Sequence, residues 1–190
     1  MNVTDVITEA HVTAHPEQGF GPALVARERA AGISEADDAY GWLTGSWELD
    51  VLHYRTDMRA RRLKAEAHFT WVLEGRAVQD VWIMPPRHER TPACGPDTNM
   101  YGITVRIWDA ALRAWRVTYL NPGTGQRDEL IGRRIGPDIV QIGTHADGTP
   151  IRWNFTDITR DSFRWTGVAL EPDGVTWRLE AEFLARRMPG

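Results

Sequence analysis

The stretch Trp47-Glu48-Leu49-Asp50-Val51-Leu52-His53 is where the pattern of the chain changes. Before it, apolar residues recur at helical intervals. Within it they alternate with other residues, as in a β-strand with one buried face. The alternation continues to the C-terminus, interrupted by turn residues such as Gly136-Pro137 and Asp147-Gly148. The strands expected from it cover residues 47–54, 63–73, 77–84, 101–108, 115–119, 127–135, 138–145, 150–157, 162–170 and 174–186.

This pattern predicts an all-β protein. About ten short strands follow one another in meander order, separated by turns, which is typical of a sandwich or a barrel. No segment between them is long enough for a helical crossover between parallel strands. A meander with one apolar face closes most simply into a barrel, which also removes exposed strand edges. We therefore predict an up-and-down antiparallel β-barrel of about 8–10 strands over residues 45–187, in a chain that forms one domain overall.

Residues 1–44 are expected to form an N-terminal arm with short helices. Residues 1–21 show little periodicity and predict an irregular arm. The segment 22–31 begins with a proline, which the first turn of a helix tolerates, and predicts a short helix. Ser34 is placed to cap a second short helix that ends near Gly45. We expect these helices to close one end of the barrel.

The composition excludes several classes of protein. The chain has 190 residues, 42% of them hydrophobic and 25% charged, which is normal for a folded protein. No apolar run approaches the ~20 residues of a membrane span, so we expect no membrane partner. The formal net charge of −4 argues against a nucleic-acid partner. A single cysteine, Cys94, excludes an internal disulfide and a multi-cysteine zinc site. Because the chain does not start with a secretory leader, we expect it in the cytoplasm.

Two features at the ends of the expected barrel carry a family resemblance. Gly45-Ser46-Trp47 opens the first strand, and Arg186 and Arg187 lie late in the last one. Joined to the meander, they resemble the lipocalin-like (calycin) barrels over residues 40–187, and in particular a bacterial branch long catalogued as a domain of unknown function. The resemblance implies that one of the two arginines packs across Trp47 as a structural residue. It also implies a cup that is open at one end and holds one small ligand.

The resemblance does not extend to a cofactor. Nitrobindins, which are haem-binding relatives of similar shape, hold haem through a histidine near the C-terminal strand. Residues 162–190 of this chain contain no histidine. His11 and His15 have helical spacing, but Pro16 follows them and no helix is expected there. We therefore predict neither a cofactor nor a metal site.

Aromatic residues on the expected inward faces are candidates for ligand binding. Pockets for small organic ligands are largely apolar, with a few placed polar groups. The chain has nine tryptophans, more than packing requires, and large flat rings suit a planar or polycyclic ligand. The alternative is that these rings simply fill the core. The aromatic candidates are Trp71, Tyr101, Tyr119, Trp153, Trp165 and Trp177.

Polar residues in phase with the apolar ones form a second group, because burial of an unpaired polar group is costly. Gln79 and Thr144 fall on the expected inward face and are predicted to contact the ligand. His53 and Asp157 also fall on the expected inward face. A histidine with a carboxylate is the smallest set of groups for acid–base catalysis near neutral pH, so these two residues are the candidate catalytic pair. The alternative is that both lie at the barrel rim in water. His145, beside a turn, is expected to be exposed.

Three functions fit this sequence. The first is binding of a small apolar or aromatic metabolite inside the barrel, as a carrier or sensor. The second is a cofactor-independent enzyme of the isomerase, cyclase or hydratase type acting on such a metabolite. The third is a structural or assembly role for a filled barrel. The arm of residues 1–21 is too apolar for a solvated tail, so we expect a homodimer through it. The proline-rich segment 84–100 is either a lid or a solvated loop.

Overall fold

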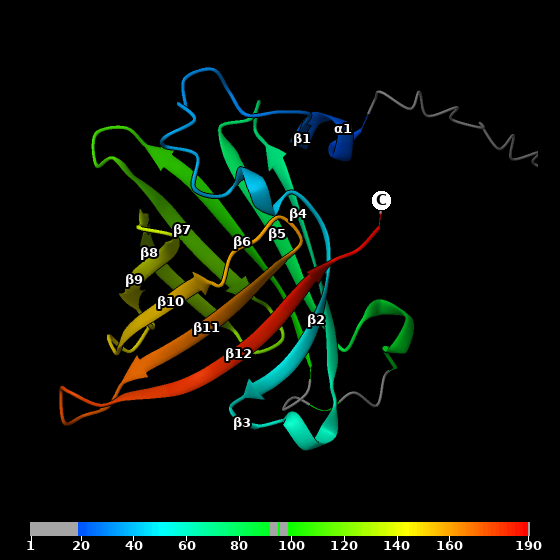
Figure 1. Ribbon diagram of the computed structural model, residues 1–190, viewed down its shortest axis with the longest axis vertical. Helices are drawn as coiled ribbons and strands as arrows, with labels where there is room; N and C mark the ends of the chain where they lie inside the picture. Colours follow the sequence, from blue (N-terminus) through cyan, green and yellow to red (C-terminus); the bar gives the residue numbers. More distant parts are fainter. Residues whose placement is uncertain (1–18, 92–94, 96–98, 190) are drawn as a thin grey trace, which may run out of the picture.

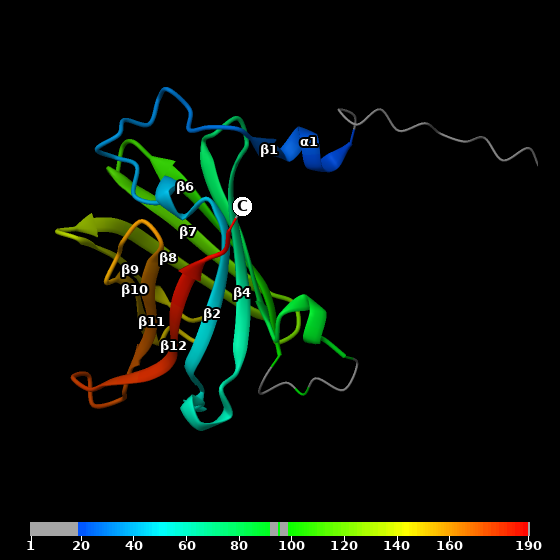
Figure 2. The same ribbon diagram turned by 45° about the vertical axis from the view of Figure 1, so that its right-hand side comes forward.

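Ten antiparallel strands wrap into a closed barrel in the computed structural model, which describes residues 19–91, 95 and 99–189 (Figure 1, Figure 2). Inward-facing side chains from these strands meet in one hydrophobic core. The barrel strands are β2 (Gly45–Tyr54), β4 (Lys64–Val72), β5 (Ala77–Met84), β6 (Met100–Asp109), β7 (Ala114–Asn121), β8 (Gln126–Ile135), β9 (Asp138–Thr144), β10 (Pro150–Thr156), β11 (Ser162–Leu170) and β12 (Trp177–Arg187).

The barrel is closed through β2, which pairs with two long strands. Its Leu49 lies opposite Ala185 of β12 on one side and opposite Ala65 of β4 on the other. From β4 to β12, each strand pairs with the next one along the chain. A two-residue strand, β3 (Thr56–Asp57), extends the end of β2. The prediction of an all-β, up-and-down antiparallel barrel is confirmed, and the ten strands lie at the upper end of the predicted range.

A short strand takes the place of most of the helix predicted over 22–31. The pairing of β2 with β4 reaches only as far as Phe69. The next residues of β4 on this side, Trp71 and Val72, pair with β1 (Val25–Ala26) instead. Extended backbone at this free edge gains sheet hydrogen bonds, whereas an isolated short helix is marginal in water. The predicted helix is therefore wrong beyond its start. Within this segment only residues 22–24 are helical, as the end of α1 (Phe20–Leu24), and α1 buries no residue.

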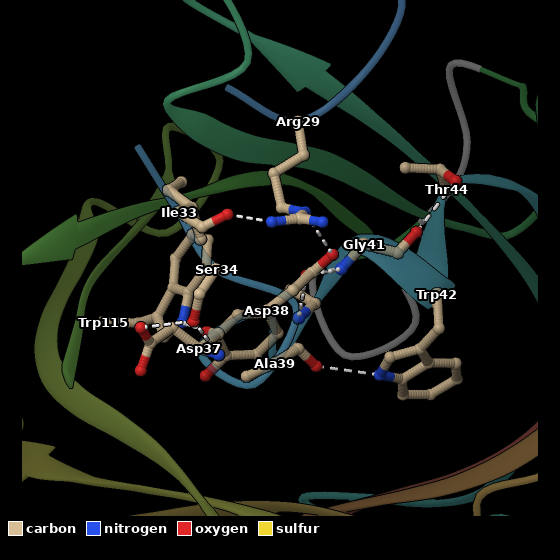
Figure 3. A network of polar contacts seen from close by, with 11 residues as sticks. Arg29, Ile33, Ser34, Asp37, Asp38, Ala39, Gly41, Trp42, Thr44 and Trp115 are labelled. Carbon is tan, nitrogen blue, oxygen red and sulfur yellow. Dashed lines mark hydrogen bonds and ion pairs between the residues drawn. The ribbon is translucent and has the colours of Figure 1, made fainter. Parts of the chain in front are cut away.

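Residues 33–43, which we call the plug, close one end of the barrel without forming the second predicted helix (Figure 3). A carboxylate oxygen of Asp38 accepts hydrogen bonds from the backbone N–H groups of Tyr40 at 3.2 Å and Gly41 at 2.7 Å. Such local side-chain bonds favour a turn over a helix. The 3-10 turn η1 (Gly41–Leu43) follows directly. The N-terminal segment thus closes the barrel through turns.

Aromatic side chains tie the plug to the barrel. The indole N–H of Trp115 donates to the carbonyl oxygen of Asp37 at 2.9 Å, and that of Trp42 donates to the carbonyl oxygen of Ala39 at 2.8 Å (Figure 3). Tyr40 is fully buried, and its ring meets the ring of Trp115 edge-on at 5.2 Å. Edge-on aromatic pairs add stability beyond the burial of their surface. These contacts fix the plug across the closed end.

The tryptophan that opens β2 is held by an arginine of β12, as the resemblance implies. The Arg187 guanidinium lies 4.1 Å from the centre of the Trp47 ring. It also donates hydrogen bonds of 2.7 Å to the carbonyl oxygens of Thr44 and Trp42. Arg186 points to solvent, with its side chain 72% exposed. Arg187 therefore joins the last strand, the first strand and the plug.

Some predictions fall on residues outside the described ranges. The predicted homodimer contact uses residues 1–21, of which 19–21 are described. The segment 84–100 includes residues 92–94 and 96–98, and with them Cys94, which also lie outside. In the part of the chain that is described, no helix has the length and apolar character needed to cross a membrane.

We predict that Arg187→Ala lowers the free energy of unfolding by about 2–4 kcal/mol, because it removes a cation–π contact and three charge-assisted hydrogen bonds, to the carbonyl oxygens of Thr44, Trp42 and Arg160. Arg186→Ala is the matched control on the neighbouring residue and should change it by less than about 0.5 kcal/mol. Urea unfolding followed by tryptophan fluorescence measures both. Equal effects of the two substitutions would show that Arg187 does not anchor the closed end.

Candidate functional site

At the end away from the plug, the barrel encloses a cavity of about 450 Å³. This volume lies within the range of pockets for small organic ligands. Exposed residues such as Arg127 and Asp147 lie at its rim, so the cavity opens to solvent. Its walls are largely aromatic, and the rings that line it belong to Tyr54, Trp82, Tyr119, Trp153, Trp165 and Phe183.

Four of these rings form a continuous belt. The ring centres of Trp82 and Trp165 are 5.7 Å apart, those of Trp165 and Trp153 are 5.5 Å apart, and those of Trp153 and Tyr119 are 5.6 Å apart. Glycines make room for them. A Cβ on Gly167 would lie 2.8 Å from the Trp165 ring, and one on Gly102 would lie 2.7 Å from the Tyr119 ring. The rings therefore pack closely against the strands, and neighbouring ring planes are inclined to each other by 53°, 58° and 83°.

Two β-bulges, one between β2 and β12 and one between β11 and β12, turn further side chains into the cavity. Leu52 of β2 has no partner on β12, so the phase of β2 reverses after it and Tyr54 faces inward. Glu180 of β12 has no partner on β11, and it lines the cavity together with its neighbour Ala181. Re-aiming of a side chain is a common consequence of a bulge. The bulges thus supply part of the site.

Asp128, His145 and Glu180, the mouth cluster, line one side of the opening. The two ring nitrogens of His145 lie 2.8 Å from an Asp128 oxygen and 3.0 Å from a Glu180 oxygen. The other Asp128 oxygen accepts from Gln126 at 2.6 Å, and the other Glu180 oxygen accepts from Arg178 at 3.2 Å. The cluster therefore joins β8, the end of β9 and β12. The structure corrects the prediction that His145 is exposed, because its side chain is only 21% exposed.

The two carboxylates determine the charge of His145. Hydrogen bonds to Asp128 and then to Glu180 stabilise the imidazolium and raise the pKa of His145 to about 10. Burial by itself would raise the pKa of Glu180, but the hydrogen bonds and positive charges of His145 and Arg178 together outweigh it, and the pKa is lowered. At neutral pH His145 is therefore a cation that donates both N–H groups. In this state it cannot accept a proton as a general base.

A buried ion pair lies where the cavity meets the plug. Arg106 donates to one Asp80 oxygen at 2.5 Å, and the backbone N–H of Thr104 donates to the other at 2.8 Å. Both charged side chains are at most 2% exposed. The Arg106 guanidinium stacks on the ring of the plug residue Tyr40 at 5.0 Å. Sequence analysis missed this pair because both residues alternate with apolar neighbours that face outward.

The structure places several predicted ligand-binding residues on the cavity wall. Tyr119, Trp153 and Trp165 face inward and line the cavity, as predicted. Trp71 also faces inward, but its ring packs against Trp115 at the closed end, with ring centres 6.3 Å apart. It does not line the cavity. Trp71 therefore fills the core, which was the alternative to ligand binding for these aromatic residues.

Three other candidates face away from the cavity, and their predicted inward orientation is wrong. Tyr101 is 46% exposed, Gln79 is partly exposed and Thr144 is exposed. On β6 and β9 the apolar set that was predicted to face inward points outward, and polar or small residues point into the barrel. On β5 the inward set is itself largely apolar, and Gln79 belongs to the other set. The outward set of β6 runs from Tyr101 to Ile107, whereas its inward set includes Thr104. Alternation located these strands but not their inward side.

Trp177 is also misplaced, because of the bulge at Glu180. The extra residue reverses the phase of β12, so Trp177 lies outside, 38% exposed, under the guanidinium of Arg152 at 5.0 Å. Phe183, near the end of the strand, does face inward as predicted. The prediction for Trp177 assumed that the same alternation continues back along β12, and the bulge interrupts it. The prediction that Trp177 lines the cavity is therefore wrong.

The structure does not bring His53 and Asp157 together in the cavity. The bulge at Leu52 places His53 on the outer face, opposite Glu182 of β12. Asp157 is exposed and forms an ion pair with Arg164 at 3.1 Å. Neither residue lines the cavity. The histidine that does so is His145, and nothing local in the sequence distinguishes it, since its carboxylate partners come from two other strands.

In comparisons with known proteins, no family model and no curated sequence matches this chain. The function has to be inferred from the cavity and the residues that line it.

We predict that His145→Gln destabilises the fold in a pH-dependent manner. The pKa of His145 is about 10 in the folded protein and 6.5 without its partners. Its contribution is therefore complete below about pH 6.5 and is lost as the pH rises toward 10. The difference in unfolding free energy between wild type and variant should be about 2 kcal/mol at pH 6 and mostly absent at pH 9.

Urea unfolding at pH 6, 7.5 and 9 provides the measurement. His88→Gln is the control, because the His88 side chain is 77% exposed and should give no such trend. A wild-type advantage over His145→Gln that stays constant from pH 6 to 9 would contradict an imidazolium held by two carboxylates.

Proposed function

We propose that this protein binds a small molecule with an apolar or aromatic body inside its barrel, as a carrier or sensor. The observation that carries the proposal is the cavity of about 450 Å³, walled by a belt of aromatic rings and open to solvent at one end. Flat rings with accessible faces favour a planar ligand. Three predicted ligand contacts, Tyr119, Trp153 and Trp165, belong to this belt.

The proposal includes the family resemblance. The ten-strand meander, with Arg187 stacked on Trp47 at the closed end, supports placing the chain among the lipocalin-like (calycin) barrels of bacterial origin. Fold alone does not determine function, so the cavity carries the argument and the resemblance is secondary.

Binding is favoured over the other two functions by specific features. An acid–base enzyme needs a group at the cavity that accepts a proton near neutral pH. His145 is already protonated there, and both of its carboxylate partners are engaged with it. His53 and Asp157 lie outside. A purely structural barrel has no need of a cavity, because unfilled volume in a core costs stability.

The proposal predicts that filling the cavity abolishes binding. We choose the fluorescent probe N-phenyl-1-naphthylamine, which is uncharged and built from two aromatic ring systems. Its emission should rise on binding while tryptophan emission falls, because three indoles line the cavity. Ala181→Phe adds a ring to the inward face of β12 and should weaken binding about tenfold or more. Ala111→Phe adds the same ring to an exposed turn and should leave binding unchanged.

Thermal melting of each variant shows whether it is folded. If Ala181→Phe does not fold, Ala146→Trp at the rim makes the same test without burying the new ring. A probe that does not bind wild type, or that binds all variants equally, would refute the proposed site. Native mass spectrometry of the freshly purified protein then gives the mass of any ligand that is lost on unfolding.

A further inference from the structure

Two hydroxyl groups on the cavity wall have unused capacity to donate a hydrogen bond. Thr104 is 3% exposed, and its hydroxyl makes no hydrogen bond with any described residue. Tyr119 is 8% exposed, and its oxygen accepts a hydrogen bond from the Asn121 side chain at 3.2 Å. The Tyr119 O–H has no acceptor within the described ranges. Buried polar groups are normally hydrogen-bonded, so two such groups facing a cavity indicate a partner that enters it.

The two hydroxyl-bearing residues are neighbours. Thr104 and Tyr119 lie directly opposite each other on β6 and β7, and both face inward. The Cβ atoms of such a pair are about 4.5–5.5 Å apart. Burial raises the pKa of Tyr119 well above its usual value, so the phenol stays protonated and keeps its donor. One wall of the cavity thus offers two neutral donors.

The charges beside this wall are paired, with Arg106 held by Asp80, although the buried Nε–H of Arg106 has no hydrogen-bond partner among the described residues. Asp80 accepts from Arg106 with one oxygen and from the backbone of Thr104 with the other. A carboxylate on the ligand would therefore add an uncompensated negative charge to a buried region, which is costly. A carbonyl oxygen accepts hydrogen bonds without adding charge. The electrostatics of this wall favour the uncharged group.

We propose that the ligand of the cavity carries an uncharged hydrogen-bond acceptor of the carbonyl class on its apolar body, and that Thr104 and Tyr119 donate to it. This inference rests on the proposed small-molecule function and names the ligand chemistry of the same cavity. It makes Thr104 and Tyr119 the residues that distinguish an oxygen-bearing ligand from a plain aromatic one.

The test compares two probes that differ in one group. The ketone 6-propionyl-2-(dimethylamino)naphthalene carries a carbonyl, and 2-(dimethylamino)naphthalene lacks the acyl group. Thr104→Val and Tyr119→Phe remove one hydroxyl each with little change of shape. Each should weaken binding of the ketone about three- to tenfold and change binding of the second probe less than about twofold. Thr104→Ser keeps the hydroxyl and should restore ketone binding. Emission of the bound ketone should shift to the blue in Thr104→Val, because a hydrogen-bonded carbonyl stabilises its excited state.

Matched controls lie on the outer face of the same two strands. Thr118→Val on β7 and Tyr101→Phe on β6 remove the same groups outside the cavity and should leave the affinities for both probes unchanged. A third probe, 6-(dimethylamino)-2-naphthoate, carries a carboxylate and should bind at least about tenfold more weakly than the ketone.

The outcomes separate this inference from the function on which it rests. If both neutral probes bind wild type and neither hydroxyl matters for the ketone, the inference is overturned and the binding function stands. If the carboxylate probe binds as tightly as the ketone, the assignment of an uncharged acceptor is overturned. If neither neutral probe binds wild type, both the inference and the proposed function are overturned.

Discussion

Closure of the sheet through β2 is the constraint on which the rest of the structure depends. Because β2 pairs with β4 and β12 at once, it cannot slip against either without losing contacts on the other. Each of the two strands that meet at this closure carries one extra residue, Leu52 of β2 in its pairing with β12 and Glu180 of β12 in its pairing with β11. These bulges reverse the phase of both strands, so Tyr54 and Glu180 reach the cavity while His53 and Trp177 do not. The geometry that closes the barrel therefore also selects what lines it.

The architecture was predictable from the sequence because it is encoded locally. Each strand shows its own alternation, and the segment predicted over 162–170 coincides with β11 (Ser162–Leu170). The structure of the N-terminal segment was not predictable, because the local pattern that suggested two helices does not show the two interactions that compete with helix formation. One is the free edge of β4, which draws in β1. The other is the Asp38 carboxylate, which accepts the backbone N–H groups that begin a turn.

The site was predictable only in part, for a different physical reason. Tyr119, Trp153 and Trp165 were found because their strands have an apolar inward face. On β6 that relation is inverted, since the cavity and the buried ion pair need polar and small residues inside. Arg106, for example, is buried, whereas Tyr101 is exposed. The mouth cluster was also not predicted, because its three residues come from segments that are distant in sequence. Periodicity reports a strand's two faces, and only long-range pairing decides which face is inside.

The distribution of charge inside the barrel completes the argument about its ligand. Arg106 is neutralised by Asp80, and the His145 imidazolium is enclosed by two carboxylates, one of which also pairs with Arg178. Every buried charge near the cavity thus has its partner within the protein. A charged ligand would have to break one of these pairs or remain unpaired in a medium of low polarity, and both cost free energy. An uncharged, largely aromatic molecule incurs neither cost, since it needs only the aromatic walls and a few hydrogen bonds.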